Sequence, residues 1–375
     1  MRKVMTIVGT RPELIKMSLV IKEMDKHFNH QLVHTGQNYD FELNEIFFEE
    51  LEIRKPDFFL NCAGANAIET IANVLTAGDR LLEKENPEAI LLYGDTNSCL
   101  VCIAAKKRKI PIFHMEAGNR SFDQRVPEEI NRKIVDHLSD INMPLTEHSR
   151  RYLLDEGLPA NRIIKTGSCM KEILEKFEPK IAASKVLARL SLQPKSYFVV
   201  SAHREENVDS PERLKELIRS LNQLSKKHQK KVLFSVHPRT QKHIENLVGQ
   251  EISKDVVLSK PLGFCDYIHL QKNAFCVLSD SGTITEESAL LGFPAVMIRD
   301  GHERPEGSDA GSLIFTNISE KRILEAVEIM TTQSINPKNH LVNDYEVQEV
   351  SKNVVRIIAS HIDFVNREVW KKSSV

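Results

Sequence analysis

Three acidic residues stand where short apolar segments end. Asp95 follows the run 89–93, Glu116 follows the run 110–114, and Glu128 opens a helical pattern further along. Such runs are typical of buried parallel strands, whose carboxyl ends form the ligand crevice of an open α/β sheet. Carboxylates that are held close together differ in pKa, which provides an acid and a base at one pH. The pattern therefore predicts acid–base chemistry at this edge.

Each of these acids also has a structural explanation. Asp95 can cap the start of a helix, and Glu128 suits the positive end of a helix dipole. Glu116 has no capping role as clear as theirs. The residues alone leave both explanations open, and they do not tell which carboxylate would be the acid and which the base.

Basic residues follow two strand-like runs in the second half of the chain. His203 follows the run 197–201, and the pair His237 and Arg239 follows the run 231–236. Each histidine can equally be a structural residue with satisfied hydrogen bonds. Arginine suits bidentate contacts with phosphate, and the repetition of basic groups favours a substrate with a polyphosphate.

The stretch 278–287 runs from a strand end through Ser281, Gly282 and Thr283 into a helix. Backbone N–H groups and hydroxyls at a helix start favour phosphate groups. Glu287 lies one turn inside the helix, where it can accept both hydroxyls of a ribose. The stretch predicts a nucleoside diphosphate site.

Further candidates lie in other loops. Arg11 stands at a helix start after the first strand and is predicted to contact a phosphate, and Arg304 lies in a charged strand-end loop. Tyr267 could stack on a base, with a core aromatic as the alternative. The sequence contains no glycine fingerprint of a dinucleotide site and no NTPase loop, so we expect no cofactor, and no metal site is expected.

Strand and helix patterns alternate along the whole chain, which predicts an α/β fold with parallel sheets covered by helices on both faces. We expect a first domain over 1–170, with the helix at about 355–375 packing back on it, and a second domain over 171–354. A strand at 162–166 and a long helix at 171–190 are expected near their boundary. A cleft between the domains would hold the ligand.

Composition restricts the possible partners. The chain has 375 residues and a formal net charge of −1, so we expect no nucleic acid partner. The longest apolar runs are shorter than a membrane span of about 18 residues, and the chain opens directly into a strand, so a cytoplasmic protein without a membrane segment is expected. Cys99 and Cys102 are expected on a buried helix face instead of in a redox or metal site.

Several short motifs follow one another in a fixed order along the chain. They are Gly-Thr-Arg-Pro-Glu, Gly-Asp-Thr, Glu-Ala-Gly-x-Arg, Pro-Glu-Glu-x-Asn-Arg, His-Arg-Glu, His-Pro and Asp-Ser-Gly-x-x-x-Glu-Glu. Together they resemble the non-hydrolysing UDP-N-acetylglucosamine 2-epimerase family over nearly the whole chain. The resemblance implies an isomerase with the GT-B fold, two Rossmann-like domains with an active-site cleft between them, a UDP-sugar substrate and a homodimer.

The resemblance also implies residue roles. Asp95, Glu116 and Glu128 match the acid–base carboxylates, and His203 matches the catalytic histidine. Glu287 matches the ribose contact, and Tyr267 falls where an aromatic stacks on uracil. Diphosphate contacts fall on Arg11, His237, Ser281, Gly282 and Thr283. Whether a nucleotide sugar also binds near Gln37 as an activator stays open.

The segments 34–48 and 54–60 resemble the capsule and O-antigen branch, which makes UDP-N-acetyl-L-fucosamine from UDP-2-acetamido-2,6-dideoxy-L-talose. Asn119 and the segment 121–127 depart from the glucosamine-type pattern. Four alternatives stay open: a UDP-N-acetylglucosamine 2-epimerase that makes UDP-N-acetylmannosamine, a GT-B glycosyltransferase, a hydrolysing relative and a non-catalytic UDP-sugar-binding protein.

Overall fold

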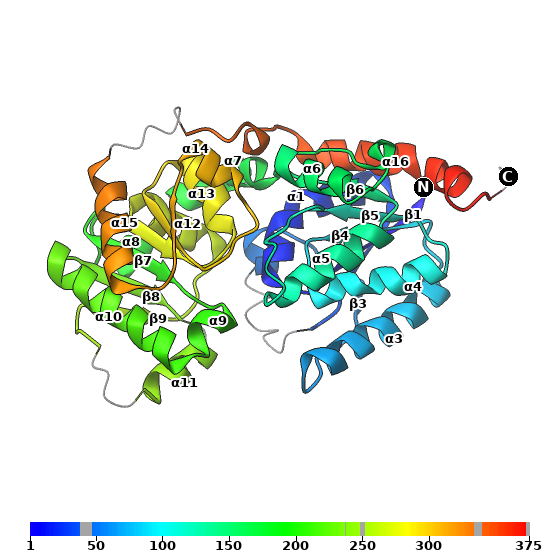
Figure 1. Ribbon diagram of the computed structural model, residues 1–375. Coiled ribbons are helices and arrows are strands. Elements are labelled where there is room, and N and C mark those ends of the chain that lie inside the picture. The colour runs from blue at the N-terminus through cyan, green and yellow to red at the C-terminus, as the bar shows by residue number, and fades with distance from the viewer. Residues whose placement is uncertain (38–46, 237, 248–251, 334–339, 373–375) are drawn as a thin grey trace. The chain divides into compact units, whose positions relative to one another are not determined.

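The computed structural model describes residues 1–37, 47–236, 238–247, 252–333 and 340–372. The chain forms two compact units, shown in Figure 1. Unit 1 comprises Met1–Lys176 and Asp344–Val375, and unit 2 comprises Phe177–Asn343. Each unit has its own sheet and its own buried core, and each is described by itself.

Unit 1 contains a six-stranded parallel sheet in the order β3-β2-β1-β4-β5-β6. Its strands are β1 Lys3–Val8, β2 Asn29–His34, β3 Phe58–Phe59, β4 Ala89–Tyr93, β5 Ile112–Met115 and β6 Ile141–Met143. This is the Rossmann order, in which the chain reverses direction across the sheet between β1 and β4. The loops that follow β1 and β4 at this switch point are the usual place for a ligand.

Helices cover both faces of this sheet (Figure 1). The helices of unit 1 are α1 Arg11–His27, α3 Ala67–Glu85, η1 Asn97–Val101, α4 Cys102–Lys107, α5 Pro127–Leu138, α6 Glu147–Asp155, η2 Ala160–Arg162 and α16 Val350–Glu368. The short helix η4 Asn343–Tyr345 begins at the last residue of unit 2. The helix α16 packs against α1 because its apolar residues recur every three or four positions along one buried face. Cys99 and Cys102 are both buried in the core of the unit, as predicted.

Unit 2 repeats the plan with the order β12-β11-β10-β7-β8-β9. Its strands are β7 Tyr197–Ser201, β8 Lys231–Ser235, β9 Val256–Ser259, β10 Cys276–Ser279, β11 Ala295–Ile298 and β12 Ile314–Thr316. The switch point lies between β7 and β10, which are neighbours in the parallel sheet. The predicted pair of parallel α/β sheets is thus confirmed.

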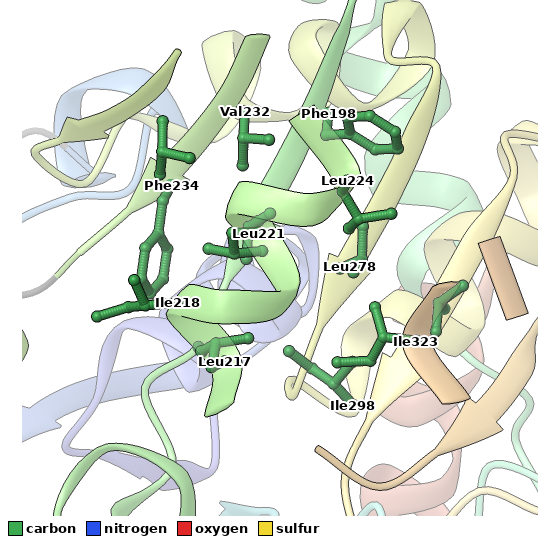
Figure 2. Close-up of a cluster of buried hydrophobic side chains, with 14 of the residues drawn as sticks. Phe198, Leu217, Ile218, Leu221, Leu224, Val232, Phe234, Leu278, Ile298 and Ile323 are labelled. Carbon is green, nitrogen blue, oxygen red and sulfur yellow. The ribbon is translucent and has the colours of Figure 1, made fainter. Parts of the chain in front are cut away.

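The helices of unit 2 are α8 Val186–Arg189, α9 Glu205–Val208, α10 Pro211–His228, α11 Pro238–Glu245, α12 Phe264–Asn273, α13 Thr283–Leu291, α14 Glu306–Ala310 and α15 Glu320–Thr332. Figure 2 shows the core beneath α10, where Leu217, Leu221 and Leu224 lie near side chains of β8 and β10. Ser210 caps the start of α10, because its side chain accepts a hydrogen bond from the backbone N–H of Arg213.

Two expectations near the boundary are wrong. The helix expected at 171–190 is two helices, α7 Met170–Ala182 and α8. The Ser184 hydroxyl accepts a hydrogen bond from the backbone N–H of Val186, and this local bond competes with a continuous helix. The strand expected at 162–166 is absent from the described sheets, where Ile163 makes an isolated bridge with Asn142. No described helix has the length and apolar character that crossing a membrane requires.

Candidate active site

The loop after β1 is held by the buried carboxylate of Glu13. Its Oε2 accepts from the backbone N–H of Gly9 at 2.9 Å and from the Thr10 hydroxyl at 2.8 Å. Its Oε1 accepts from the Thr96 hydroxyl at 3.0 Å. Burial raises the pKa of Glu13 to about 7, although these hydrogen bonds act in the opposite direction. Glu13 therefore joins the two loops of the switch point in unit 1.

A glycine is required at the start of this loop. A Cβ added at Gly9 would lie 1.9 Å from Oγ of Ser98 and 2.3 Å from Oγ1 of Thr35. The Ser98 hydroxyl also donates to Oε1 of Gln37 at 2.8 Å. Gln37 is thus bonded to the segment that follows β4. Whether an activator binds near it stays open, and the neighbouring residues 38–46 lie outside the described chain.

Arg11 begins α1 and is exposed. Its guanidinium lies over the ring of Phe47, 5.3 Å from the ring centroid. Thr10 precedes it in an extended conformation, and its hydroxyl bonds to Glu13 instead of capping the helix. The structure places Arg11 at a helix start that follows β1, while its contact with phosphate stays a prediction.

Asp95 lies just beyond β4 and is tied to α5. Oδ2 of Asp95 accepts from Nε of Arg132 at 2.8 Å, and its backbone carbonyl accepts from the side-chain amide of Asn131 at 2.9 Å. The side chain of Asp95 is 23% exposed, whereas that of Arg132 is 3% exposed. A buried cation therefore holds a carboxylate that is still open to a ligand.

Glu116 lies just beyond β5 with a left-handed backbone, at a φ of 62°. A residue other than glycine with this conformation is strained, and such residues cluster at functional sites. Oε2 of Glu116 accepts from the Tyr93 hydroxyl at 2.6 Å. A Cβ added at Gly94 would lie 3.8 Å from Oε1 of Glu116, so this carboxylate lies beside the loop that carries Asp95.

Glu128 lies in the first turn of α5 and is partly buried. The next residue, Glu129, is buried and has a different task. It accepts hydrogen bonds from the backbone N–H groups of Ser121 and Phe122 and from Arg132. Burial would raise the pKa of Glu129, but the bonds from Ser121 and Arg132 hold it below its usual range. Glu129 thus anchors the preceding loop.

The three predicted acids consequently come to one edge of unit 1. Asp95 follows β4, Glu116 follows the neighbouring strand β5, and Glu128 begins α5, the helix that contacts Asp95 through Arg132. Their placement agrees with acid–base work, while their individual roles stay predictions.

Asn119 departs from the glucosamine-type pattern, and its side chain is turned into the fold. It is 5% exposed, and its Oδ1 accepts from the Ser149 hydroxyl at 2.8 Å. The neighbouring Phe122 is instead 69% exposed and packs edge-on against Tyr152. The two departures from the glucosamine-type pattern therefore differ in exposure, because Asn119 is packed inside the fold and Phe122 faces solvent.

The switch point of unit 2 contains a histidine–aspartate pair. Nδ1 of His203 lies 3.0 Å from Oδ1 of Asp280, and the side chain of His203 is 50% exposed. Asp280 is fully buried and also accepts from the backbone N–H groups of His203 and Arg204 and from the Asn207 amide. Burial would raise the pKa of Asp280, but the charge of His203 and these bonds lower it to about 2. The pair orients the imidazole so that Nε2 faces away from Asp280.

The helix α13 starts directly after β10. The hydroxyls of Ser281 and Thr283 lie 3.1 Å apart at this start. A Cβ added at Gly282 would lie 2.7 Å from Oε1 of Glu303 and 3.2 Å from Nε of Arg304, so a larger residue would displace the Glu303 carboxylate. Two hydroxyls and the first N–H groups of a helix together suit a phosphate group.

Three further candidates in unit 2 have partners within the fold. Glu287 is 6% exposed and accepts from the Gln271 amide at 2.7 Å. Arg304 is 5% exposed and donates to Glu286 at 2.5 Å. Tyr267 lies on α12, partly buried against the core. Their predicted contacts with a nucleotide are compatible with these positions and stay predictions.

Some of the chain lies outside the description. His237 and the side chain of Arg239 are in this group, as is the segment 38–46, which includes most of the segment 34–48 that resembles the capsule branch. Within the described ranges, no cluster of His, Cys, Asp and Glu side chains has the arrangement of a metal site.

The sequence assigned no role to Glu13, Arg132 or Asp280, although each lies in one of the motifs named above. Arg132 lies one helical turn after Glu128, a spacing that would have placed both on one face of α5. Asp280 immediately precedes Ser281 at the end of a strand. Each is buried and acts by holding another residue.

Comparisons with known proteins show which family and fold this chain resembles. A family model described as UDP-N-acetylglucosamine 2-epimerase matches residues 22–359. The structure of UDP-N-acetylglucosamine 2-epimerase from Rickettsia bellii is 55% identical, with a TM-score of 0.93, over 99% of this chain and 100% of that one. The Methanocaldococcus jannaschii UDP-GlcNAc 2-epimerase in complex with UDP-GlcNAc and UDP is 34% identical, with a TM-score of 0.89, over 96% and 99% of the two chains.

A relative that is named for another substrate is also similar. The UDP-2,3-diacetamido-2,3-dideoxy-D-glucuronate 2-epimerase of Pseudomonas aeruginosa is 34% identical over 345 residues, which are 90% of this chain and 95% of that protein. The expected fold class, two Rossmann-like domains of the GT-B type, is confirmed by the two sheets and these neighbours.

Proposed function

This chain belongs to the UDP-N-acetylglucosamine 2-epimerase family, a family of isomerases, and we propose that it inverts C2 of a UDP-2-acetamido sugar. The C2 proton of such a sugar is not adjacent to a carbonyl, so simple deprotonation is very unfavourable. In the proposed route a base removes the C2 proton while the C1–O bond breaks and UDP leaves with its electron pair. UDP then adds again to C1 of the glycal, and an acid protonates C2 from the opposite face.

One observation supports this proposal: Asp95 follows β4, Glu116 follows the neighbouring strand β5, and Glu128 lies in the first turn of α5, the helix that bonds to Asp95. Elimination and re-addition need a base for one face of the sugar and an acid for the other. They also need firm binding of the diphosphate that leaves and returns. The helix start at Ser281, Gly282 and Thr283 suits that second task.

We assign roles within the two units accordingly. The three carboxylates exchange protons at C2, and His203 acts through Nε2, because Asp280 engages its Nδ1. Binding of the UDP group is assigned to Arg11, His237, Arg239, Tyr267, Ser281, Gly282, Thr283, Glu287 and Arg304. No step in this route requires a hydride carrier.

For the sugar, we propose UDP-2-acetamido-2,6-dideoxy-L-talose as substrate and UDP-N-acetyl-L-fucosamine as product, in capsule or O-antigen biosynthesis. A 6-deoxy sugar carries a methyl group at C6. The ring of Phe122, 69% exposed between Glu116 and Glu128 in the chain, offers an apolar surface for such a group. The second candidate converts UDP-N-acetylglucosamine to UDP-N-acetylmannosamine, and the similarity to the UDP-N-acetylglucosamine 2-epimerase from Rickettsia bellii favours it.

A single incubation series in deuterated water tests these proposals. The L-talo and L-fuco UDP-sugars and UDP-N-acetylglucosamine are each supplied without an acceptor, and NMR follows inversion and deuterium at C2. We expect the L-talo and L-fuco forms to interconvert with deuterium incorporation. Turnover of UDP-N-acetylglucosamine alone would support the second candidate.

Other outcomes of the same series identify the rival functions. Release of free sugar and UDP would indicate a hydrolysing relative. Sugar transfer only after an acceptor is added would indicate a glycosyltransferase. Normal UDP binding without turnover of any sugar would indicate a binding protein.

Variants test the three acids. We expect Asp95→Asn, Glu116→Gln and Glu128→Gln to lower kcat by roughly 100-fold or more, the usual range for general acid–base catalysis. UDP affinity should stay within several-fold, because the UDP contacts are assigned elsewhere. Glu83→Gln is the matched control, since its side chain is 71% exposed on α3. Full activity in all three variants would contradict the proposal.

A further inference from the structure

We propose that the buried pair His114 and Asp136 is a positioning device that sets the spacing of the three acids. The inference rests on the proposed function, because it concerns the two loops and the helix that carry Asp95, Glu116 and Glu128. Neither member of the pair was indicated by the sequence, and neither is exposed to a ligand, at 1% and 0% exposure.

The first contact reaches the loop that carries Asp95. His114 lies in β5, and its Nε2 lies 2.7 Å from the backbone carbonyl oxygen of Gly94, the residue before Asp95. Gly94 has a left-handed backbone, at a φ of 73°, and its N–H donates to the carbonyl of Met115 at 3.0 Å. The imidazole thereby fixes the peptide from which the Asp95 loop departs.

The second contact reaches the other two acids. Asp136 lies on α5, two turns after Glu128, and its Oδ1 lies 2.9 Å from Nδ1 of His114. Its Oδ2 accepts from the backbone N–H of Gly118 at 3.1 Å, two residues after Glu116. One carboxylate is therefore bonded to the loop of Glu116 while its own helix carries Glu128.

The loop around Gly118 leaves little room for adjustment. Gly118 has a φ of 83°, and an added Cβ would lie 2.3 Å from the backbone oxygen of Ser149. Arg120 donates from Nη1 to Oδ2 of Asp136 at 2.7 Å and makes two further bonds of 2.7 Å to Glu156. Asp136 thus holds the loop that follows Glu116 at two points, Gly118 and Arg120.

The hydrogen bonds also define the protonation of the pair. A backbone carbonyl can only accept, so Nε2 of His114 must donate to Gly94. Asp136 accepts from Gly118 and Arg120 through Oδ2, and with this carboxyl ionised, Nδ1 of His114 donates to Oδ1. We therefore assign a proton to each ring nitrogen of His114, and the cationic ring and Arg120 together balance the buried charge of Asp136. The hydrogen bonds of His114 to the Gly94 carbonyl and to Asp136 on α5 are then charge-assisted and strong.

Two aspartate variants test this role. Asp136→Asn breaks the positioning device. Asp140→Asn is the matched control, because Asp140 is also 0% exposed and bonds to Lys106 at 2.5 Å and to the backbone N–H of Ile112 at 3.0 Å, at the opposite edge of the sheet. Thermal unfolding of both variants measures the stability that each loses, so that kcat is compared at a temperature where both are folded.

For Asp136→Asn we expect kcat to fall by roughly 100-fold, the scale of a 1 Å displacement of reacting groups, with KM and UDP affinity within about three-fold. Asp140→Asn should keep kcat within about three-fold. A purely structural role would lower kcat equally in both variants, and that result would overturn the proposal.

A spectroscopic measurement does not depend on activity. In protein labelled with ¹⁵N-histidine, the ring nitrogens of His114 are identified by the signals that are missing in His114→Gln. We expect both nitrogens to show the shifts of an imidazolium; one protonated and one bare nitrogen would overturn the assignment even if Asp136→Asn does not fold. Wild-type protein that shows the imidazolium but no epimerisation would contradict the proposed function alone.

Discussion

At the scale of single residues, Glu13 shows that a buried carboxylate can accept several hydrogen bonds and still be destabilised in its charged form by burial. Three donors surround its carboxylate, yet burial outweighs them and places its pKa at about 7. In the unfolded chain the carboxyl would titrate near 4.5. Between these values the folded state binds a proton that the unfolded state has released, so stability falls as the pH rises through this window.

This difference predicts the pH dependence of a single variant. From pH 4.5 to pH 8, the free energy of unfolding of the wild-type protein should fall by about 3 kcal/mol more than that of Glu13→Gln, since each pKa unit corresponds to about 1.4 kcal/mol. Urea unfolding at several pH values measures this, with the exposed Glu69→Gln as the control. Parallel pH profiles for wild type and Glu13→Gln would contradict the prediction.

Residues proposed to act on a ligand can be named from the sequence more easily than residues that hold other residues in place. Asp95 and His203 stand directly after strands, and that position is visible in the chain. Glu13 depends on Thr96, and His114 depends on Asp136, which lies 22 positions away. Such partners meet only when the strands are assembled in order, so no local pattern reveals them.

At the scale of elements, α10 illustrates how a helix is fixed by its buried face. Its apolar residues recur at helical spacing, and the buried ones include Leu217, Leu221 and Leu224 (Figure 2). Ser210 and Pro211 mark its start in the sequence, so the beginning of Pro211–His228 can be predicted from the chain. The edge strand β12 cannot be predicted in this way, because its three residues are too few to show a period.

The packing of α10 predicts the cost of a cavity. Leu221→Ala should lower the free energy of unfolding by about 2–5 kcal/mol, the range for removing a fully buried leucine side chain. Ile329→Ala on α15 is the control, because that side chain is 44% exposed and should cost much less. Urea unfolding of both variants provides the measurement, and similar small losses would show that the core relaxes around Leu221.

At the scale of the whole molecule, the proposed tasks are divided between two units. The acids Asp95, Glu116 and Glu128 lie in unit 1, and the groups assigned to UDP lie mainly in unit 2. The reaction requires both sets to act on one molecule. The homodimer expected from the resemblance stays a prediction that sedimentation velocity would test.

This division predicts where UDP alone protects the backbone. In hydrogen exchange followed by mass spectrometry, UDP should slow exchange in the segments 201–208 and 279–288 of unit 2. The segment 114–130 of unit 1 should need a UDP-sugar for comparable protection. Equal protection of all three segments by UDP would contradict the assignment of the nucleotide groups.

The discontinuity of unit 1 has a consequence for synthesis on the ribosome. The chain leaves unit 1 at Lys176 and returns at Asp344, whose carboxylate accepts from the backbone N–H of Glu147 and pairs with Lys165. Unit 2 is one continuous segment, so translation delivers it entirely before the helix that packs on α1 emerges. In a nascent chain, the proposed nucleotide-binding unit would thus be complete while the unit that carries the three acids still lacks α16. Synthesis from the N-terminus therefore completes the acid-bearing unit last.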